Sequence, residues 1–327
     1  MTAFFGSGQT LTSLDFDIAA QTTWRSSPES GDADRRSWLN DGYVVLPQLF
    51  SHDEIQSYNA SVKAVRENYD NGRDAHGFGD RIGQLHQYCP ELVKFAAHPT
   101  IIAFLKWAFS DAPVLFGSLN FDRGTQQEAH IDAIFFYPQP LYSMAGAWIA
   151  LEDVNPDAGP LFYLSGSHRW GFRHSEDVVR DRPDLADARE KARRGELGPD
   201  ERGQVVSRIA SAWTQDLLSL EMERNAARTP MPIKAGDVII WHSLLAHGGL
   251  PRRRAALGRK SVVFHFIGRN TKLYTFEQFL LYSRDEFGTQ PSQPMNLCSQ
   301  FGLEVMQYPY FVTYHEGREI VHPLRPK

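Results

Sequence analysis

A histidine and an aspartate in this chain are spaced so that they could bind one metal ion. His130 and Asp132 are separated by a single residue. Side chains alternate between the two faces of an extended strand, so an imidazole and a carboxylate at this spacing would point to the same side. A second imidazole would complete a set of two histidines and one carboxylate. Such a set leaves positions open on an octahedral Fe(II) ion, as non-haem iron oxygenases require.

The second imidazole has four candidates, which are His168, His242, His247 and His265. His247 is followed by Gly248 and Gly249, where the backbone can turn close to a bound group because glycine has no side chain. His242 follows a tryptophan in a predicted strand and is interpreted as a packed or surface imidazole. His265 lies within an apolar strand and is interpreted as a hydrogen-bonded core histidine. His168 stays open at this point, and His247 is our choice for the third ligand.

Several short motifs accompany these residues in a fixed order along the chain. They occupy residues 126–132, 147–153, 155–161, 165–169, 235–242, 247–249 and 258–266. As an ordered set they resemble the phytanoyl-CoA dioxygenase family, whose members are Fe(II)- and 2-oxoglutarate-dependent oxygenases on a double-stranded β-helix. The resemblance runs from about residue 38 to residue 268.

The resemblance implies a complete set of metal ligands. It places the distal histidine at the His-Gly pair, residues 247–248, so His130, Asp132 and His247 become the metal ligands and the catalytic residues. His168 lies in a loop that borders the active site in the family, but it is not a ligand there.

A cosubstrate site needs a buried cation, because the distal carboxylate of 2-oxoglutarate would otherwise lose its water without a partner. Arginine suits this role through its planar, bidentate fork. Arg252, Arg253 and Arg254 form a run after a proline, and such runs are usually solvated. Arg259 directly precedes a predicted strand and matches the family's cosubstrate arginine, with a spacing from His247 about one residue longer than the commonest form.

Two further residues are assigned to the cosubstrate site. Gln127 lies on the predicted strand that enters the metal site, and its amide could contact the cosubstrate or the substrate. A structural hydrogen bond is an equal alternative for this amide. Trp148 has the same two interpretations, with core packing favoured.

The composition limits the class of protein. Of the 327 residues 42% are hydrophobic and 22% are charged, as in an ordinary globular protein. The net charge of -5 argues against nucleic-acid binding. Cys89 and Cys298 are the only cysteines, so neither a disulfide framework nor a thiolate metal site is expected, which agrees with a reducing cytoplasm. The first residues lack a signal-peptide pattern and no long apolar run follows, so we expect neither export nor a membrane span.

The expected fold is mainly β with flanking helices, a double-stranded β-helix (jelly-roll, cupin-like) barrel with a helical insertion. Short strands on both sides of one metal site favour such a barrel over alternating strands and helices. We expect a flexible N-terminal arm over residues 1–36 and a single oxygenase domain over residues 37–327. The strands are predicted at residues 43–46, 114–121, 129–137, 145–151, 161–164, 233–241 and 262–267.

Helices are predicted around the barrel. Residues 51–54 read Ser-x-x-Glu, a capping box that predicts a helix after it, and a second helix is expected to begin near Pro99. Residues 71–84 contain four glycines and are predicted to form a loop. The charged stretch 173–228 is interpreted as a helical lid or as a decorative excursion. The C-terminal extension, residues 269–327, is rich in aromatic residues, which predicts core packing, a homodimer interface or a wall of the substrate site.

The predicted function is that of a non-haem iron oxygenase using Fe(II), 2-oxoglutarate and O2, with ascorbate as an optional stimulant. It oxidises, and by default hydroxylates, an unactivated C–H bond of a small organic substrate and releases succinate and CO2. Apart from this substrate, a homodimer is one of the alternatives that the aromatic extension leaves open. We expect a cytoplasmic protein that binds neither nucleic acid nor a membrane.

Two other functions are considered. One is a cupin-like metal-dependent isomerase that does not use 2-oxoglutarate. The other is a catalytically silent barrel that only binds. Arg259 argues against the isomerase, which has no need of a carboxylate clamp, and the intact set of His130, Asp132 and His247 argues against the silent barrel.

Overall fold

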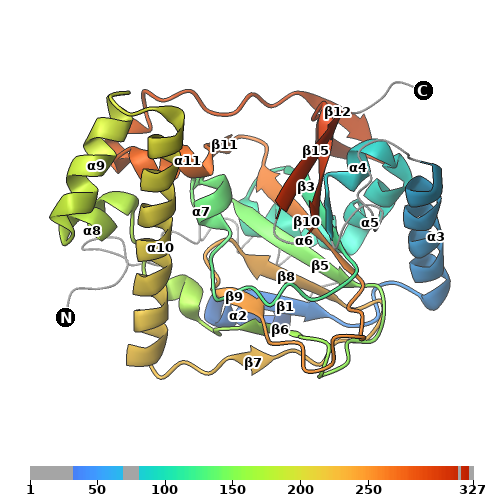
Figure 1. The fold of residues 1–327 in the computed structure, drawn as a ribbon. Coiled ribbons are helices and arrows are strands. Elements are labelled where there is room, and N and C mark those ends of the chain that lie inside the picture. The colour runs from blue at the N-terminus through green and yellow to red at the C-terminus, as the bar shows by residue number, and fades with distance from the viewer. Residues whose placement is uncertain (1–31, 69–80, 316–317, 324–327) are drawn as a thin grey trace.

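The computed structural model describes residues 32–68, 81–315 and 318–323, and its centre is a large sheet with a small sheet beside it (Figure 1). In spatial order the main path of the large sheet is β1 (Tyr43–Leu46), β8 (Val238–His242), β5 (Met144–Ala150), β10 (Ser261–Gly268), β3 (Pro113–Phe121), β2 (Arg81–Gly83), β14 (Tyr310–His315) and β15 (Arg318–Pro323). Beside this path, β13 (Leu303–Met306) pairs with β3, and β12 (Leu297–Gln300) pairs with β13. The small sheet contains β7 (Thr229–Pro230), β6 (Leu161–Tyr163) and β9 (His247–Gly249), and a separate pair joins β4 (Pro138–Gln139) to β11 (Lys272–Leu273).

The central strands are buried along their whole length because both faces of the large sheet are covered. On β10, Val262 and Phe264 point into a core shared with helices. Val263 and His265 point the other way, into a cavity that the small sheet also lines. The alternation follows from the period of two in a strand. The expected jelly-roll fold class is confirmed.

Helices cover the outer face of the large sheet, and they are α2 (Asp32–Asp41), α3 (His52–Asn68), α4 (Leu85–Tyr88), η1 (Pro90–Leu92), α5 (Val93–Ala96) and α6 (Pro99–Phe109). Both predicted helix starts are confirmed. The Ser51 hydroxyl accepts from the backbone N–H of Glu54 at 3.3 Å, and the Glu54 carboxylate accepts from the backbone N–H of Ser51 at 2.8 Å. Pro99 is the first residue of α6. No single helix in the described ranges is long and apolar enough to cross a membrane, although η1–α5 and α6 together meet the length and composition of a bent span.

The charged stretch 173–228 contains three helices, which are α8 (Ser175–Arg180), α9 (Pro183–Arg193) and α10 (Pro199–Glu223). They pack at one end of the sheets beside α7 (Ala133–Phe136) and α11 (Phe276–Leu281) (Figure 1). Trp213 and Leu217 of α10 belong to the same apolar core as Ile131 and Ile134. The insertion therefore packs against residues 131–134, the segment that contains the predicted metal ligand Asp132.

The C-terminal extension also holds this insertion. The guanidinium of Arg284, in η3 (Arg284–Glu286), forms ion pairs with Glu176 and Asp177 of α8. Phe279 of α11 lies in the same core as Trp213. The aromatic extension thus serves as core, which is the first of its three predicted interpretations.

Four sequence predictions were wrong in detail. Residues 129–137 do not form a strand, because the chain makes one bridge at His130 and then turns into α7, whose apolar residues pack into the insertion core. Residues 81–83, expected in a loop, form β2 between β3 and β14. The strand expected at 233–241 begins only at Val238, after a turn in which Gly236 has φ +88°. Of the expected arm, residues 32–36 belong to α2 and the rest lies outside the described residues.

Replacement of Trp213 by alanine tests whether the insertion and the barrel unfold as one unit. Trp213 is fully buried, so Trp213→Ala is expected to lower the free energy of unfolding by about 3–5 kcal/mol while unfolding stays a single transition. Urea titration followed by circular dichroism measures both quantities. Met222→Ala on the same helix is the control, since Met222 is 73% exposed and should change stability little. A separate early transition for the insertion would instead support an independently moving lid.

Candidate metal centre

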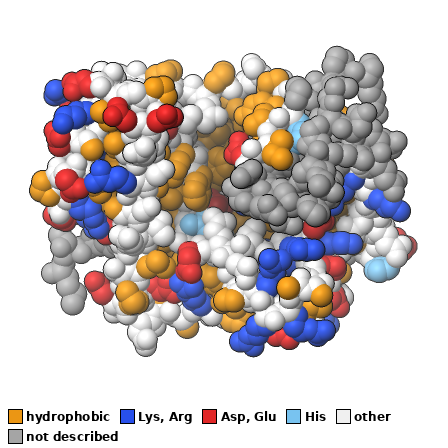
Figure 2. All heavy atoms as spheres, in the orientation of Figure 1, with side chains coloured by type: hydrophobic (Ala, Val, Ile, Leu, Met, Phe, Trp, Pro, Cys, Tyr) orange, Lys and Arg blue, Asp and Glu red, His pale blue; other side chains and the backbone are white. Residues whose placement is uncertain are grey.

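A cavity of about 320 Å³ lies between the large sheet and the small one. Figure 2 shows the surface hollowed in the middle of the face, with hydrophobic side chains along the hollow and a histidine within it. The large sheet contributes Arg81, Leu119, Phe121, Trp148, Trp241, Val263 and His265 to the lining. The opposite wall contains His130, Asp132, Phe135, Phe136, Leu161, His247 and Gly248.

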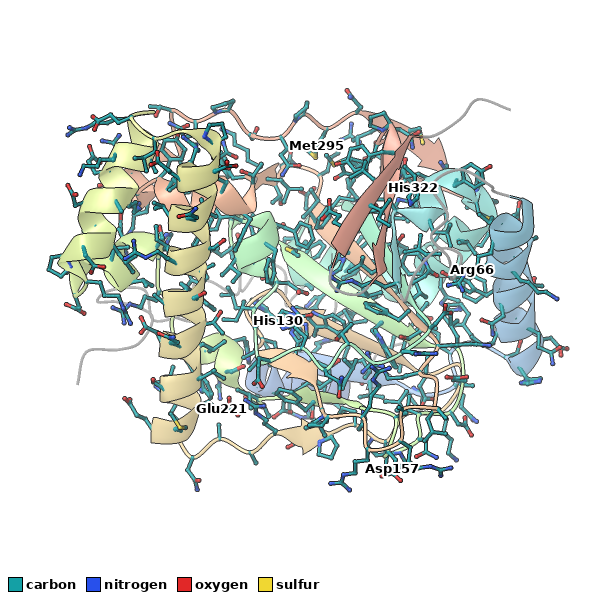
Figure 3. All side chains as sticks on the ribbon, in the orientation of Figure 1. Arg66, His130, Asp157, Glu221, Met295 and His322 are labelled. Atoms are coloured by element: carbon teal, nitrogen blue, oxygen red, sulfur yellow. The ribbon has the colours of Figure 1, made fainter. Side chains whose placement is uncertain are left out.

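A backbone bridge brings His130 and His247 together, although they are far apart in sequence. The N–H of His130 donates to the carbonyl of His247 at 2.9 Å, and the N–H of His247 donates to the carbonyl of His130 at 3.0 Å. The two residues form an isolated antiparallel pair. Their ring centroids are 4.4 Å apart, and His130 lies near the centre of the molecule (Figure 3).

Asp132 completes the cluster from the turn before α7. Its backbone is already helical, with φ -61° and ψ -35°, so a change of direction and not an extended strand points the carboxylate back at the histidines. Asp132 Oδ1 lies 3.6 Å from His247 Nε2 and 3.8 Å from His130 Nε2. Possible ligand atoms of the three residues all lie within 4.8 Å of one another.

These distances fit a divalent metal ion. Two ligand atoms bound at about 2.1 Å and at right angles lie roughly 3 Å apart, so the two distances from Asp132 to the histidines need to close by less than about 1 Å. Two imidazole nitrogens and one carboxylate oxygen also form the donor set that suits non-haem Fe(II). The three predicted ligands are therefore brought together in a geometry that could hold iron.

Each imidazole is oriented by a contact between its Nδ1 and a backbone carbonyl two residues earlier in the chain. Nδ1 of His130 lies 2.9 Å from the carbonyl oxygen of Glu128, and Nδ1 of His247 lies 2.9 Å from the carbonyl oxygen of Leu245. A carbonyl can only accept, so Nδ1 carries the proton in each ring. Each Nε2 is then left with a free lone pair facing Asp132, as metal binding requires.

The burial of the cluster sets its charge. Burial lowers the pKa of His130 to about 4, and the nearby His247 acts in the same direction. Burial raises the pKa of Asp132, but His247, His265 and His130 outweigh this effect and hold it below the ordinary carboxyl value. At neutral pH His130 is neutral and Asp132 is ionised, which are the forms that bind a metal.

Arg259 is buried at another part of the cavity. Only 1% of the residue is exposed, and burial lowers the pKa of its guanidinium to about 10, so it stays charged at neutral pH. Nη1 donates to the carbonyl of Gly159 at 2.8 Å, whereas the buried Nε has no hydrogen-bond partner within the described part of the chain. Arg253 belongs to the run of three arginines at residues 252–254, and its Nη1 lies 4.0 Å from Oδ1 of Asp157. Asp157 lies at the edge of the molecule (Figure 3). Of Arg253 and Arg259, it is therefore Arg259 that lines the cavity and could hold an anion there.

Gln127 and Trp148 also line the cavity, as the cosubstrate assignment requires. The Trp148 ring lies 6.0 Å from the Arg259 guanidinium carbon, and its buried indole N–H has no partner among the described residues. The backbone carbonyl of Gln127 accepts from Gly249 at 2.9 Å. A Cβ on Gly248 would lie 2.5 Å from this carbonyl oxygen, so the glycine pair serves close backbone packing.

The other three candidate histidines differ in whether they line the cavity. His242 is fully buried, with Nδ1 accepting from the backbone N–H of Leu244 and its ring 5.4 Å from that of His168. Neither His242 nor His168 lines the cavity. His265 does line it, and its Nε2 lies 3.6 Å from Asp132 Oδ2. Its interpretation as an ordinary core histidine was therefore incomplete.

Sequence reasoning missed one residue at this centre altogether. The indole N–H of Trp241 donates to Asp132 Oδ2 at 2.7 Å. Its ring centroid lies 4.8 Å from that of His247, so it contacts two of the three candidate ligands. The period of two along β8 could have placed Trp241 on the cavity face, but not its partner. No residue of the 173–228 insertion lines the cavity in the described structure, so the lid role stays a prediction.

The sequence of this chain matches the family model described as phytanoyl-CoA dioxygenase over residues 38–260. The chain belongs to the phytanoyl-CoA dioxygenase family. It is 25% identical over 175 residues to phytanoyl-CoA dioxygenase domain-containing protein 1 of Mus musculus, covering 51% of this chain and 50% of that protein. It is 29% identical over 170 residues to phytanoyl-CoA dioxygenase 1 of Oryza sativa subsp. japonica, covering 46% and 59%. The chain thus spans about half the length of the first of these family members.

Solved structures share the family fold. The non-heme alpha ketoglutarate dependent carbocyclase SnoK from nogalamycin biosynthesis has a TM-score of 0.56 and 19% identity, covering 82% of this chain and 94% of that chain. EctD from S. alaskensis, crystallised with 2-oxoglutarate and 5-hydroxyectoine, has a TM-score of 0.53 and 15% identity, covering 85% and 89%. At these identities the likeness shows a shared fold.

Arg259→Ala tests the buried cation. We expect it to weaken 2-oxoglutarate binding by about 2–4 kcal/mol, because a charge-assisted contact in a buried site is lost, while Fe(II) binding changes much less. Anaerobic isothermal titration of each ligand measures the two effects. Arg253→Ala is the matched control, since Arg253 is 80% exposed. The opposite ranking of the two arginines would show that the cosubstrate arginine is misassigned.

Proposed function

We propose that this member of the phytanoyl-CoA dioxygenase family is an Fe(II)- and 2-oxoglutarate-dependent oxygenase that hydroxylates a C–H bond of a small organic substrate. The observation that carries the proposal is the convergence of His130, Asp132 and His247 in the same cavity as the buried Arg259. When bound, iron supplies the activation of O2 coupled to oxidative decarboxylation of 2-oxoglutarate. One oxygen atom enters the C–H bond and the other enters succinate, with release of CO2.

The residues of the chain have separate tasks in this scheme. His130, Asp132 and His247 would hold the metal on one wall of the cavity. Arg259 would pair with the distal carboxylate of 2-oxoglutarate, and its unpartnered Nε leaves a buried donor for that purpose. Both charges are removed from water, which strengthens their interaction with bound groups.

The remaining wall suits an apolar part of the substrate. Phe135 and Phe136 follow Asp132 on α7 and line the cavity. The Phe135 ring lies 5.8 Å from the His130 ring and 5.2 Å from the Phe276 ring of α11. These rings would exclude water and hold a C–H bond near the metal. Desaturation, epoxidation and cyclisation would use the same ligands and differ in how the substrate is held.

Arg259 argues against the second candidate, a metal-dependent isomerase without 2-oxoglutarate. A fully buried guanidinium is costly to desolvate, and an isomerase would not need a carboxylate clamp at this position. The intact ligand cluster argues against a barrel that only binds. The oxygenase accounts for both features.

Anaerobic titration of the Fe(II)-loaded protein with 2-oxoglutarate tests the proposal. A chelated cosubstrate gives a weak metal-to-ligand charge-transfer band in the visible spectrum. We expect this band in the wild-type protein and its loss in His247→Ala, which removes one ligand. Absence of the band from correctly folded, iron-loaded wild-type protein would rule out the oxygenase and leave the isomerase as the better candidate.

Because Asp132 supplies a carboxylate at the metal site, we predict that the enzyme forms no halogenated product. The carboxylate would hold the metal where a halide would otherwise bind, so the product is expected to carry oxygen or a new double bond even in high chloride. Mass spectrometry of the product formed in chloride and in bromide buffer measures this. Asp132→Gly should weaken iron binding and abolish the native reaction. A product mass that follows the halide would contradict the role given to Asp132.

A further inference from the structure

The two oxygens of Asp132 have different neighbours. Oδ1 faces the candidate ligands, 3.6 Å from His247 Nε2 and 3.8 Å from His130 Nε2. Oδ2 accepts a hydrogen bond from the indole Nε1 of Trp241 at 2.7 Å. His265 Nε2 also faces Oδ2, but at 3.6 Å it lies beyond hydrogen-bond distance. The Trp241 indole is therefore the hydrogen-bond donor that the described structure gives to this carboxylate.

The indole reaches Asp132 because of a glycine on the neighbouring strand. Gly146 of β5 is directly paired with Trp241 of β8. A Cβ at position 146 would lie 2.5–2.8 Å from three atoms of the indole, including Nε1. Real Cβ atoms do not approach other atoms so closely, so any larger residue would displace the ring. The ring also packs against His247 and Tyr163, with centroids 4.8 Å and 5.9 Å away.

We propose that Trp241 is a positioning residue that keeps Asp132 a one-oxygen metal ligand. This inference rests on the proposed function. An octahedral ion has six positions, of which two histidines and one carboxylate oxygen take three. A chelating cosubstrate would take two more, so one would remain for O2. If Asp132 bound through both oxygens, that last position would be lost.

The indole N–H prevents this second contact. A hydrogen bond to an ionised carboxylate is roughly twice as strong as one between neutral groups, and here it is buried. It holds Oδ2 toward β8 and leaves Oδ1 facing the histidines. Outer contacts of this kind change metal affinity or activity by roughly 10–100-fold when removed. Trp241 thus acts on the reaction through Asp132 without needing to contact the substrate.

The test removes the donor and keeps the ring volume. Trp241→Phe deletes the N–H, and site-specific benzothienylalanine at position 241 replaces it by sulfur in a ring of nearly the same shape. Gly146→Ala leaves every polar group in place but pushes the indole away. Trp213→Phe is the matched control, since the indole of this buried tryptophan donates to the carbonyl of Arg173 at 2.9 Å in the insertion. Thermal melting shows which variants are folded. If Trp241→Phe is unfolded, the benzothienylalanine variant is used for the test in its place.

Two measurements are made without turnover. Anaerobic Fe(II) titration gives the metal affinity, which should change by roughly 10–100-fold in the three site variants, because the second oxygen of Asp132 is then free to bind the ion. Nitric oxide, a stand-in for O2, gives a high-spin signal in electron paramagnetic resonance when it binds Fe(II). We expect the variants to bind nitric oxide without 2-oxoglutarate, and to lose roughly 10-fold or more of that affinity when 2-oxoglutarate is present. The control should match the wild type in both measurements.

The proposal is overturned if folded Trp241 variants bind Fe(II) and nitric oxide as the wild type does. It is also overturned if nitric-oxide binding falls equally with and without 2-oxoglutarate, because that pattern indicates general damage to the site. Failure of the proposed function is distinguishable from both results. In that case the wild-type protein itself gives no charge-transfer band, whereas the Fe(II) affinities of wild-type and variant proteins still report on Trp241.

Discussion

The reciprocal backbone bridge between His130 and His247 is the interaction on which the centre depends. It fastens the segment leaving β3 to the edge of the small sheet, and its two hydrogen bonds fix the distance between two imidazoles. The glycines after His247 permit the close approach, since a side chain on Gly248 would collide with the backbone of Gln127. The sharp turn after His130 then carries Asp132 back toward both rings. Loss of this bridge would separate the ligands before any metal could bind.

The cavity holds two buried charges of opposite sign that do not pair with each other in the described structure. Asp132 is stabilised by the three imidazoles around it and by the Trp241 indole. Arg259 has one carbonyl partner and an unsatisfied Nε. Burying such groups is unfavourable unless partners compensate for the lost water. A divalent cation beside Asp132 and a dicarboxylate beside Arg259 would supply the missing partners, so the electrostatics of the cavity favour the pair of cofactors proposed.

The insertion and the C-terminal extension support the ligand segment from outside. Ile131 and Ile134, on either side of Asp132, pack into the same core as Trp213 of α10 and Phe279 of α11. Arg228, just after α10, pairs with Glu221 and Glu128, and the Glu128 carbonyl is the one that faces His130 Nδ1. The short turn into α7 is therefore stable because helices distant in sequence bury its apolar side chains, although these residues alone favoured a strand.

Features that depend on local pattern or on composition could be predicted from the sequence. The strand at residues 43–46, the Ser51–Glu54 cap and the start at Pro99 are short-range signals, and the ordered motifs identified the family and three convergent ligand types. The turn into α7 and the contacts around Asp132 instead depend on residues that are distant in sequence. The turn at Asp132 overrides strand propensity because burial against the insertion is worth more than local preference. The contact of Trp241 with Asp132 joins residues 109 positions apart through space left by Gly146, and no local pattern encodes such a meeting.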